Sequence, residues 1–284
     1  MKPSLDIALI GYGTIARLAL ETLAAEAPGA IGKLIVVSRE SGRQRAVNMI
    51  EEIGAGLARE TVLATGIEEA LASKPGLVVE AAGHGALCQH GPAALASGTD
   101  LIVTSVGALA DDALRNALDE ASERSGALYN IIPGAVGGLD ILAAAKLSGL
   151  TRVVYTSRKP PAAWAGTAAE KMTDLTSITH ETVFFRGDAG QAARMFPQNA
   201  NVAATIALKG AGFAATQVEL VADPAVSRNV HELNVEAGSA DFTIRIEGRP
   251  APGNPKTSLT TAYSLAQSII EHMNRSRLRS PSAA

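Results

Sequence analysis

The sequence has little cysteine, no long apolar run and no excess of charge of one sign, and each shortage excludes a class of protein. Cys88 is the only cysteine in 284 residues, which rules out a disulfide scaffold and a zinc site built on thiolates. We therefore expect no metal site. No apolar stretch reaches the roughly 20 residues that cross a bilayer, and the start of the chain does not resemble a signal peptide. These features predict a cytoplasmic protein that does not bind membranes.

The charge balance and the length narrow the class further. The 25 basic and 28 acidic residues give a net charge of -3, without the basic excess that nucleic-acid binding requires. We therefore expect no nucleic-acid partner. Hydrophobic residues make up 47% of the chain, enough to bury the cores of two ordinary domains.

The most informative stretch runs from Asp6 to Ala16. Its first half is short, apolar and rich in branched residues, as in a strand buried on both faces of a parallel sheet. Its second half has the spacing Gly-x-Gly-x-x-Ala and leads into a helix-favouring segment. Gly11 permits a tight turn, and Gly13 lets a pyrophosphate approach the backbone. The helix begins at Thr14 and Ile15, and its free N–H groups would face the phosphates. We predict a dinucleotide site here; the alternative is a plain strand–helix turn.

The choice between the two nicotinamide cofactors depends on the end of the second strand, Leu34–Val37. An NAD-specific site usually has an acidic residue near this point, which binds the ribose 2′-OH. Here Arg39 stands instead, either to meet a 2′-phosphate or simply as a solvated arginine. We therefore expect both NAD and NADP to be accepted. Ala82 follows the predicted strand Leu77–Glu80 in a glycine-rich loop, at the sheet edge where cofactors lie, and His84 near it is either structural or close to the nicotinamide.

The alternation of apolar patterns predicts an α/β protein: an N-terminal Rossmann dinucleotide-binding domain and a second α+β domain with a mixed or antiparallel sheet. The break Pro133–Gly138 separates them, and a long amphipathic helix at Thr257–Met273 should pack on the first domain. We predict a dinucleotide-binding domain at 1–132 plus 257–284 and a catalytic and dimerisation domain at 133–256. Helices are expected at 43–53, 67–72, 87–96, 111–123, 139–147 and 201–209, and strands at 61–64, 101–104, 127–131, 152–157, 181–186, 216–222, 228–236 and 241–247.

His231 is the candidate proton-transfer residue of the second domain. Strand alternation places Asn229, His231 and Leu233 on one face. An unperturbed imidazole titrates near ~6.5, which suits proton transfer at neutral pH. The alternative is a structural histidine in the core or on the surface, whose ring nitrogens are hydrogen-bonded and which takes no part in catalysis.

The sequence resembles the L-aspartate dehydrogenase family over nearly its whole length. The resembling blocks are Gly11–Ala16, Ile132–Asp140, Arg158–Pro161, Phe196–Ala204, Asn229–Glu232 and Asn254–Ser258. The resemblance implies NAD(P)-dependent oxidative deamination of L-aspartate through iminoaspartate to oxaloacetate and ammonia, or its reverse, by a homodimer. It identifies His231 as the catalytic histidine and Ala135 and Asn201 as cofactor contacts. It also implies the two-domain plan of homoserine dehydrogenase and dihydrodipicolinate reductase.

The sequence leaves open which residue binds the substrate carboxylates, and it leaves two alternative functions. The dicarboxylate substrate needs a cation, and Arg158, Lys159 and Lys256 are all candidates. A related oxidoreductase of the same architecture, acting on another amino or keto acid, would carry similar motifs. A non-catalytic NAD(P)-binding sensor that signals by domain closure is the third reading.

Overall fold

The computed structural model describes residues 4–53, 56–197 and 199–279, except for the side chains of 255–256 and 277–279. The chain divides into two compact units. Unit 1 comprises Met1–Ser105, Asp111–Ile132 and Ala262–Ala284, and unit 2 comprises Val106–Ala110 and Pro133–Thr261. This division differs from the expected domain ranges in two places. It assigns Val106–Ala110 to unit 2, and the C-terminal segment of unit 1 begins at Ala262 rather than at residue 257.

Unit 1 is built on a six-stranded sheet. Its strands are β1 Leu5–Ile10, β2 Ile31–Val37, β3 Ala58–Ala64, β4 Leu77–Glu80, β5 Leu101–Val103 and β6 Tyr129–Ile131. They pair in the order β3-β2-β1-β4-β5-β6, and every pairing is parallel. The strand order reverses between β1 and β4, which is the point where doubly wound sheets bind dinucleotides. The predicted Rossmann-type domain is thus confirmed.

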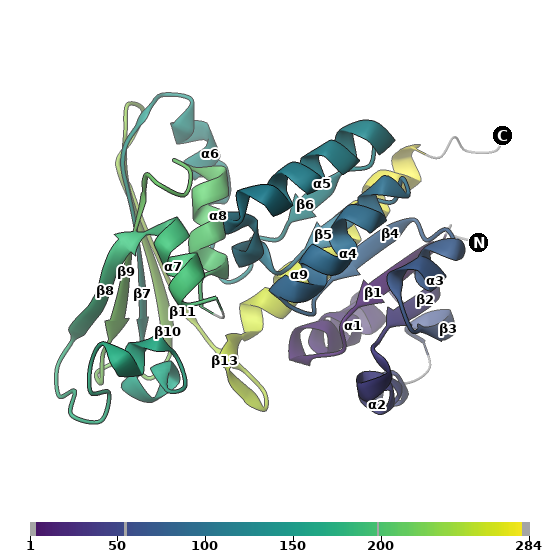
Figure 1. The fold of residues 1–284 in the computed structure, drawn as a ribbon, viewed down its shortest axis with the longest axis horizontal. Helices are drawn as coiled ribbons and strands as arrows, with labels where there is room; N and C mark the ends of the chain where they lie inside the picture. The colour runs from purple at the N-terminus through teal and green to yellow at the C-terminus, as the bar shows by residue number, and fades with distance from the viewer. Residues whose placement is uncertain (1–3, 54–55, 198, 280–284) are drawn as a thin grey trace. The chain divides into compact units, whose positions relative to one another are not determined.

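Helices pack with this sheet in unit 1, and all but the last of them lie between its strands in the sequence. They are α1 Thr14–Glu26, α2 Arg43–Ile53, α3 Ile67–Ala72, α4 His84–Ala96, α5 Asp112–Ser125 and α9 Leu259–Arg279, with a short 3₁₀ turn η1 at Glu40–Gly42. Helices α4 and α5 lie side by side (Figure 1). Ile7 and Leu9 of β1 pack in one buried cluster with Leu20 of α1 and with Leu265 and Ile269 of α9. Burying each such side chain contributes about 1.5–3 kcal/mol.

Unit 2 contains a five-stranded mixed sheet. Its strands are β7 Leu150–Lys159, β8 Thr182–Asp188, β9 Thr216–Ala222, β10 Asn229–Ala237 and β11 Phe242–Gly248, in the order β11-β10-β7-β9-β8. The pair β7 and β9 is parallel, and the other neighbours are antiparallel. A two-stranded ribbon, β12 Pro250–Ala251 and β13 Asn254–Ser258, follows. The predicted mixed sheet is confirmed.

Helices lie against this sheet in unit 2 (Figure 1). They are α6 Leu139–Lys146, α7 Ala189–Met195 and α8 Asn201–Lys209, with the 3₁₀ turns η2 Val106–Ala110, η3 Pro161–Trp164 and η4 Ala168–Lys171. Apolar spacing predicts α6 and α8 but not the short α7. The capping box at its start fixes it: the Asp188 side chain accepts from the Gln191 N–H, and the Gln191 side chain accepts from the Asp188 N–H.

Among the described residues, no helix combines the length and apolar character that crossing a bilayer requires. Within the same residues, no cluster of three or more His, Cys, Asp or Glu side chains is arranged to hold a metal ion.

Candidate active site

The glycine turn between β1 and α1 has the geometry that a dinucleotide requires. Gly11 has φ +117°, and a Cβ at this position would lie 2.5 Å from the carbonyl oxygen of Ala81, so only glycine fits. A Cβ at Gly13 would instead meet open space. Gly13 is the N-cap of α1, and no described side chain caps this helix start. Thr14 and Ile15 open the helix, so its first N–H groups and positive dipole end remain suited to bind phosphates.

The loop that carries Ala82 is held by a buried carboxylate at the end of β4. Glu80 is fully buried, and its Oε1 accepts hydrogen bonds from the N–H groups of Ala82 and Gly83 at 2.8 and 2.9 Å. The Ser105 hydroxyl donates to the same oxygen at 2.8 Å, and the Ser105 N–H donates to Oε2 at 2.9 Å. One side chain therefore fixes the loops after β4 and β5 at the carboxyl edge of the sheet.

Arg39 follows β2 and is exposed, at the start of η1. Its carbonyl oxygen accepts the N–H of Gly42, and the guanidinium of Arg45 lies 5.5 Å from the ring centroid of Tyr12, within the glycine motif. Arg39 is thus the basic residue that follows the end of β2, where a ribose 2′-phosphate would lie. His84 forms the first residue of α4, directly after the Ala82 loop.

His231 lies in unit 2, on the face of the sheet that carries the buried cluster. The antiparallel pairing of β10 with β7 sets His231 opposite Ser157 and Leu233 opposite Tyr155. Tyr155, Ser157 and Lys159 therefore share the face of His231, because alternate residues of a strand point the same way. His231 is 7% exposed, Tyr155 is fully buried, and Lys159 is 6% exposed. The sequence pattern places Tyr155, Ser157 and His231 in strands but ends the first strand before Lys159, which β7 includes, and it does not show that the two strands are neighbours.

The His231 imidazole is held by Tyr155. Its Nδ1 lies 2.7 Å from the Tyr155 hydroxyl, and the two ring planes are nearly parallel, with an interplanar angle of 11°. Burial, together with the positive charge of Lys159, lowers the pKa of His231 to about 3. The ring is therefore neutral at physiological pH, in contrast to the ordinary titration near ~6.5 that the sequence suggests.

Lys159 is a buried cation beside this histidine. Its Nζ donates to Oδ1 of Asn199 at 2.7 Å and lies 4.7 Å from the ring centroid of the buried Trp164. Arg158, next to it in sequence, points to the opposite face and pairs with Glu181 and Asp223 at 2.6 and 2.9 Å. Of the three cation candidates, Lys159 is thus the one near His231; the side chain of Lys256 lies outside the described residues.

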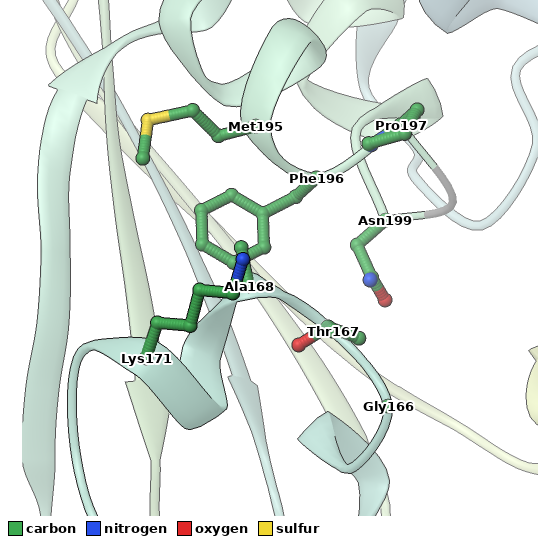
Figure 2. A pocket seen from close by; sticks show the side chains of 8 residues that line it. All are labelled: Gly166, Thr167, Ala168, Lys171, Met195, Phe196, Pro197 and Asn199. Carbon is green, nitrogen blue, oxygen red and sulfur yellow. The ribbon is translucent and has the colours of Figure 1, made fainter.

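Asn199 also borders a pocket of about 310 Å³ in unit 2. This volume lies at the lower end of the ~300–1,000 Å³ typical of small-molecule sites. Figure 2 shows Asn199 facing Thr167 across the pocket, with the buried Phe196 between the helix end and the loop. The lining residues are Gly166, Thr167, Ala168, Lys171, Met195, Phe196, Pro197 and Asn199.

The remaining predicted cofactor contacts, Ala135 and Asn201, also belong to unit 2. Ala135 is 5% exposed within the buried cluster. Asn201 begins α8, and its Oδ1 accepts a hydrogen bond from the N–H of Gly107 in η2 at 2.8 Å. Sequence reasoning does not find Tyr155, Asn199 or Glu80. For Glu80 a signal exists: an acidic residue ends an otherwise apolar buried strand.

Family models match both halves of the chain. The model described as "Aspartate dehydrogenase, C-terminal" matches residues 140–272, and "Homoserine dehydrogenase, NAD binding domain" matches residues 11–130. An L-aspartate dehydrogenase from Polaromonas sp. is 42% identical over 275 residues, which cover 96% of this chain and 98% of that protein. One from Pseudomonas aeruginosa is 39% identical over 268 residues, with 94% and 97% covered.

Solved structures agree with these matches. An aspartate dehydrogenase from Thermotoga maritima superposes with a TM-score of 0.72 at 25% identity, covering 99% of this chain and 100% of that one. A dihydrodipicolinate reductase from Paenisporosarcina sp. TG-14 has a TM-score of 0.53 at 11% identity, with 96% and 94% covered, and shares the fold alone.

Proposed function

The chain belongs to the aspartate dehydrogenase family, and from this premise we propose that it catalyses the NAD(P)-dependent oxidative deamination of L-aspartate. The reaction runs through iminoaspartate to oxaloacetate and ammonia and is reversible. The observation that carries the mechanism is the buried, neutral imidazole of His231 beside the Lys159 ammonium. The shared name of the relatives favours this reaction over a related oxidoreductase or a silent sensor.

The glycine turn holds the cofactor. Gly11 and Gly13 leave the backbone accessible, and the first N–H groups of α1, at Thr14 and Ile15, bind the pyrophosphate. Arg39 lies where a 2′-phosphate would be read, and Ala82 lies on the loop that Glu80 fixes. Ala135 and Asn201 are further cofactor contacts, as the family resemblance implies. A bound nicotinamide would supply the acceptor for the hydride that leaves the substrate Cα.

Proton transfer then falls to His231. Its Nδ1 is engaged by Tyr155, so Nε2 is the nitrogen that meets the reacting groups. As water attacks the carbon of the protonated imine, the π electrons of the C=N bond move to nitrogen, which becomes a neutral amine, and Nε2 takes the proton that the water gives up. A substrate with two carboxylates brings negative charge near Lys159. That charge opposes the effect of the ammonium and raises the pKa of His231 when substrate binds.

Lys159 is the proposed partner of a substrate carboxylate. Its ammonium lies on the same face of the sheet as His231, so a substrate carboxylate that meets it there is held beside the proposed base, and its charge distinguishes dicarboxylates from monocarboxylates. We further propose that the enzyme is a homodimer, as its family resemblance implies, and that it works in the cytoplasm, where nicotinamide cofactors and L-aspartate are soluble metabolites. Sedimentation of the purified chain tests the dimer.

Activity is tested by following NAD(P)H consumption with oxaloacetate and ammonia, against a panel of other keto acids that includes a monocarboxylate. We expect a clear preference for oxaloacetate. His231→Ala should lower kcat by ~10²–10⁴, as removal of a positioned acid–base group does, while binding of NAD(P)H, measured by fluorescence, remains. His180→Ala, which removes an exposed histidine of unit 2, is the matched control. A folded His231→Ala protein with near-normal turnover would contradict the assignment.

A further inference from the structure

The buried Tyr155 hydroxyl is the group in contact with the second nitrogen of the His231 ring. The two residues lie on adjacent antiparallel strands, and Oη and Nδ1 are 2.7 Å apart. The two ring planes are nearly parallel and their centroids are 6.1 Å apart, so the hydroxyl meets Nδ1 edge to edge rather than over the face of the imidazole. The hydrogen bond thus favours one orientation of the imidazole.

We propose that Tyr155 is the positioning residue of His231, accepting the Nδ1–H with its hydroxyl oxygen so that Nε2 presents a lone pair to the reacting water. This inference rests on the proposed function. A neutral imidazole has one N–H and one lone pair, and the group that contacts one nitrogen decides which nitrogen carries the proton. If Tyr155 donated its hydrogen to Nδ1 instead, Nε2 would carry the proton and could not act as a base.

Tyr155 itself stays protonated throughout. Burial raises its pKa. The proton taken from water therefore resides on Nε2 until it passes to the departing amine, while Nδ1 keeps its own proton. In the charged state the Nδ1–H···Oη contact becomes a charge-assisted hydrogen bond and is stronger than in the neutral ring. Tyr155 thus stabilises the imidazolium, which forms when Nε2 takes the proton from water, more than it stabilises the neutral ring.

The protonated nitrogen can be identified directly in the wild-type protein. Labelling the histidines with ¹⁵N and assigning His231 by comparison with His231→Ala gives separate shifts for the two ring nitrogens. We expect Nδ1 to carry the proton and Nε2 to show the shift of a lone-pair nitrogen. A proton on Nε2 would overturn the proposal. This reading needs no turnover, so it stands apart from the proposed function, which fails if oxaloacetate and ammonia give no NAD(P)H consumption.

Kinetics supply the second test. Tyr155→Phe removes only the hydroxyl, and we expect kcat to fall by ~10–100-fold, as activity does when a metal-bound histidine loses the partner of its other nitrogen, with little change in KM. Tyr129→Phe is the matched control: its hydroxyl also makes a 2.7 Å hydrogen bond, to Asp119, but in unit 1. Normal kcat in folded Tyr155→Phe would overturn the proposal.

A double variant separates positioning from a structural role. In the His231→Ala background, Tyr155→Phe should cause no further loss of kcat, because the group that Tyr155 orients is gone. A purely structural hydroxyl would instead lower kcat equally in both backgrounds, which would overturn the proposal.

Discussion

The side-chain oxygen of Asn201 accepts a hydrogen bond from the backbone N–H of Gly107, and this contact joins positions 94 residues apart in the chain. It ties the first turn of α8 to η2, the 3₁₀ turn that follows β5. An asparagine that sequence resemblance implies as a cofactor contact thus also has a structural partner. We expect the cofactor contact to use the amide nitrogen rather than Oδ1, in which case substitution separates the two roles.

Asn201→Asp keeps an acceptor oxygen for the Gly107 N–H but removes the amide donor. We therefore expect its melting temperature to stay near that of the wild type while the KM for the cofactor rises. Asn201→Ala leaves the Gly107 N–H without this partner, so unit 2 should lose about 1–3 kcal/mol of stability as well. Differential scanning calorimetry and cofactor titration measure the two effects. Equal cofactor affinity in wild type and Asn201→Asp would show that the amide donor does not contact the cofactor.

Arg39→Ala should weaken the binding of NADP more than the binding of NAD. The guanidinium is exposed, so we place the loss at about tenfold in the KM for NADP, the low end for a hydrogen bond to a charged group. Steady-state kinetics with each cofactor measure the ratio. Arg59→Ala, which removes another exposed arginine of unit 1, is the matched control and should leave the ratio unchanged. Equal losses for both cofactors would show that Arg39 does not read the phosphate.

Some of the features behind these predictions can be predicted from the sequence, and others cannot. The turn at Gly11 is visible because its left-handed backbone and contact with Ala81 demand glycine within a known spacing. Helix α2 and strands β4 and β9 follow from apolar periodicity alone, with the bounds expected. The Tyr155–His231 contact is not visible, because it depends on which of several strands lies beside β10 and in which register. A central strand such as β7 gives no local sign of its neighbours.

The pKa of His231 likewise cannot be predicted from the sequence, because it depends on how deeply the ring is buried and on the nearby charge of Lys159. With a native pKa of about 3 and an unfolded value near ~6.5, His231 remains neutral in the fold while the unfolded chain takes up a proton between these values. Its contribution to stability is therefore fully present above the unfolded pKa and is lost as pH falls towards the native pKa. From about pH 7 to about pH 5 the loss should reach ~2 kcal/mol.

Urea unfolding of wild type and His231→Asn at both pH values checks this contribution. The variant lacks the titrating group, so its free energy of unfolding should fall by ~2 kcal/mol less than that of the wild type. His180→Asn, at an exposed histidine, should behave as the wild type does. Parallel losses in wild type and His231→Asn would mean that His231 titrates alike in the folded and unfolded states.

Glu80→Gln tests whether one carboxylate organises the cofactor edge of unit 1. The wild-type oxygens receive only donors: the N–H groups of Ala82, Gly83, Thr104 and Ser105 and the Ser105 hydroxyl. An amide would turn one oxygen into an NH₂ that faces these donors, leaving buried N–H groups without an acceptor at about 1–3 kcal/mol each.

We therefore expect Glu80→Gln to lower the melting temperature and to raise the KM for NAD and NADP alike, because the Ala82 loop is released without any change at Arg39. The matched control is Glu60→Gln at an exposed glutamate paired with Lys33, where the same chemical change should cost less than about 1 kcal/mol. If Glu80→Gln melts and binds cofactor as the wild type does, the loops after β4 and β5 must be held by their own packing rather than by this carboxylate.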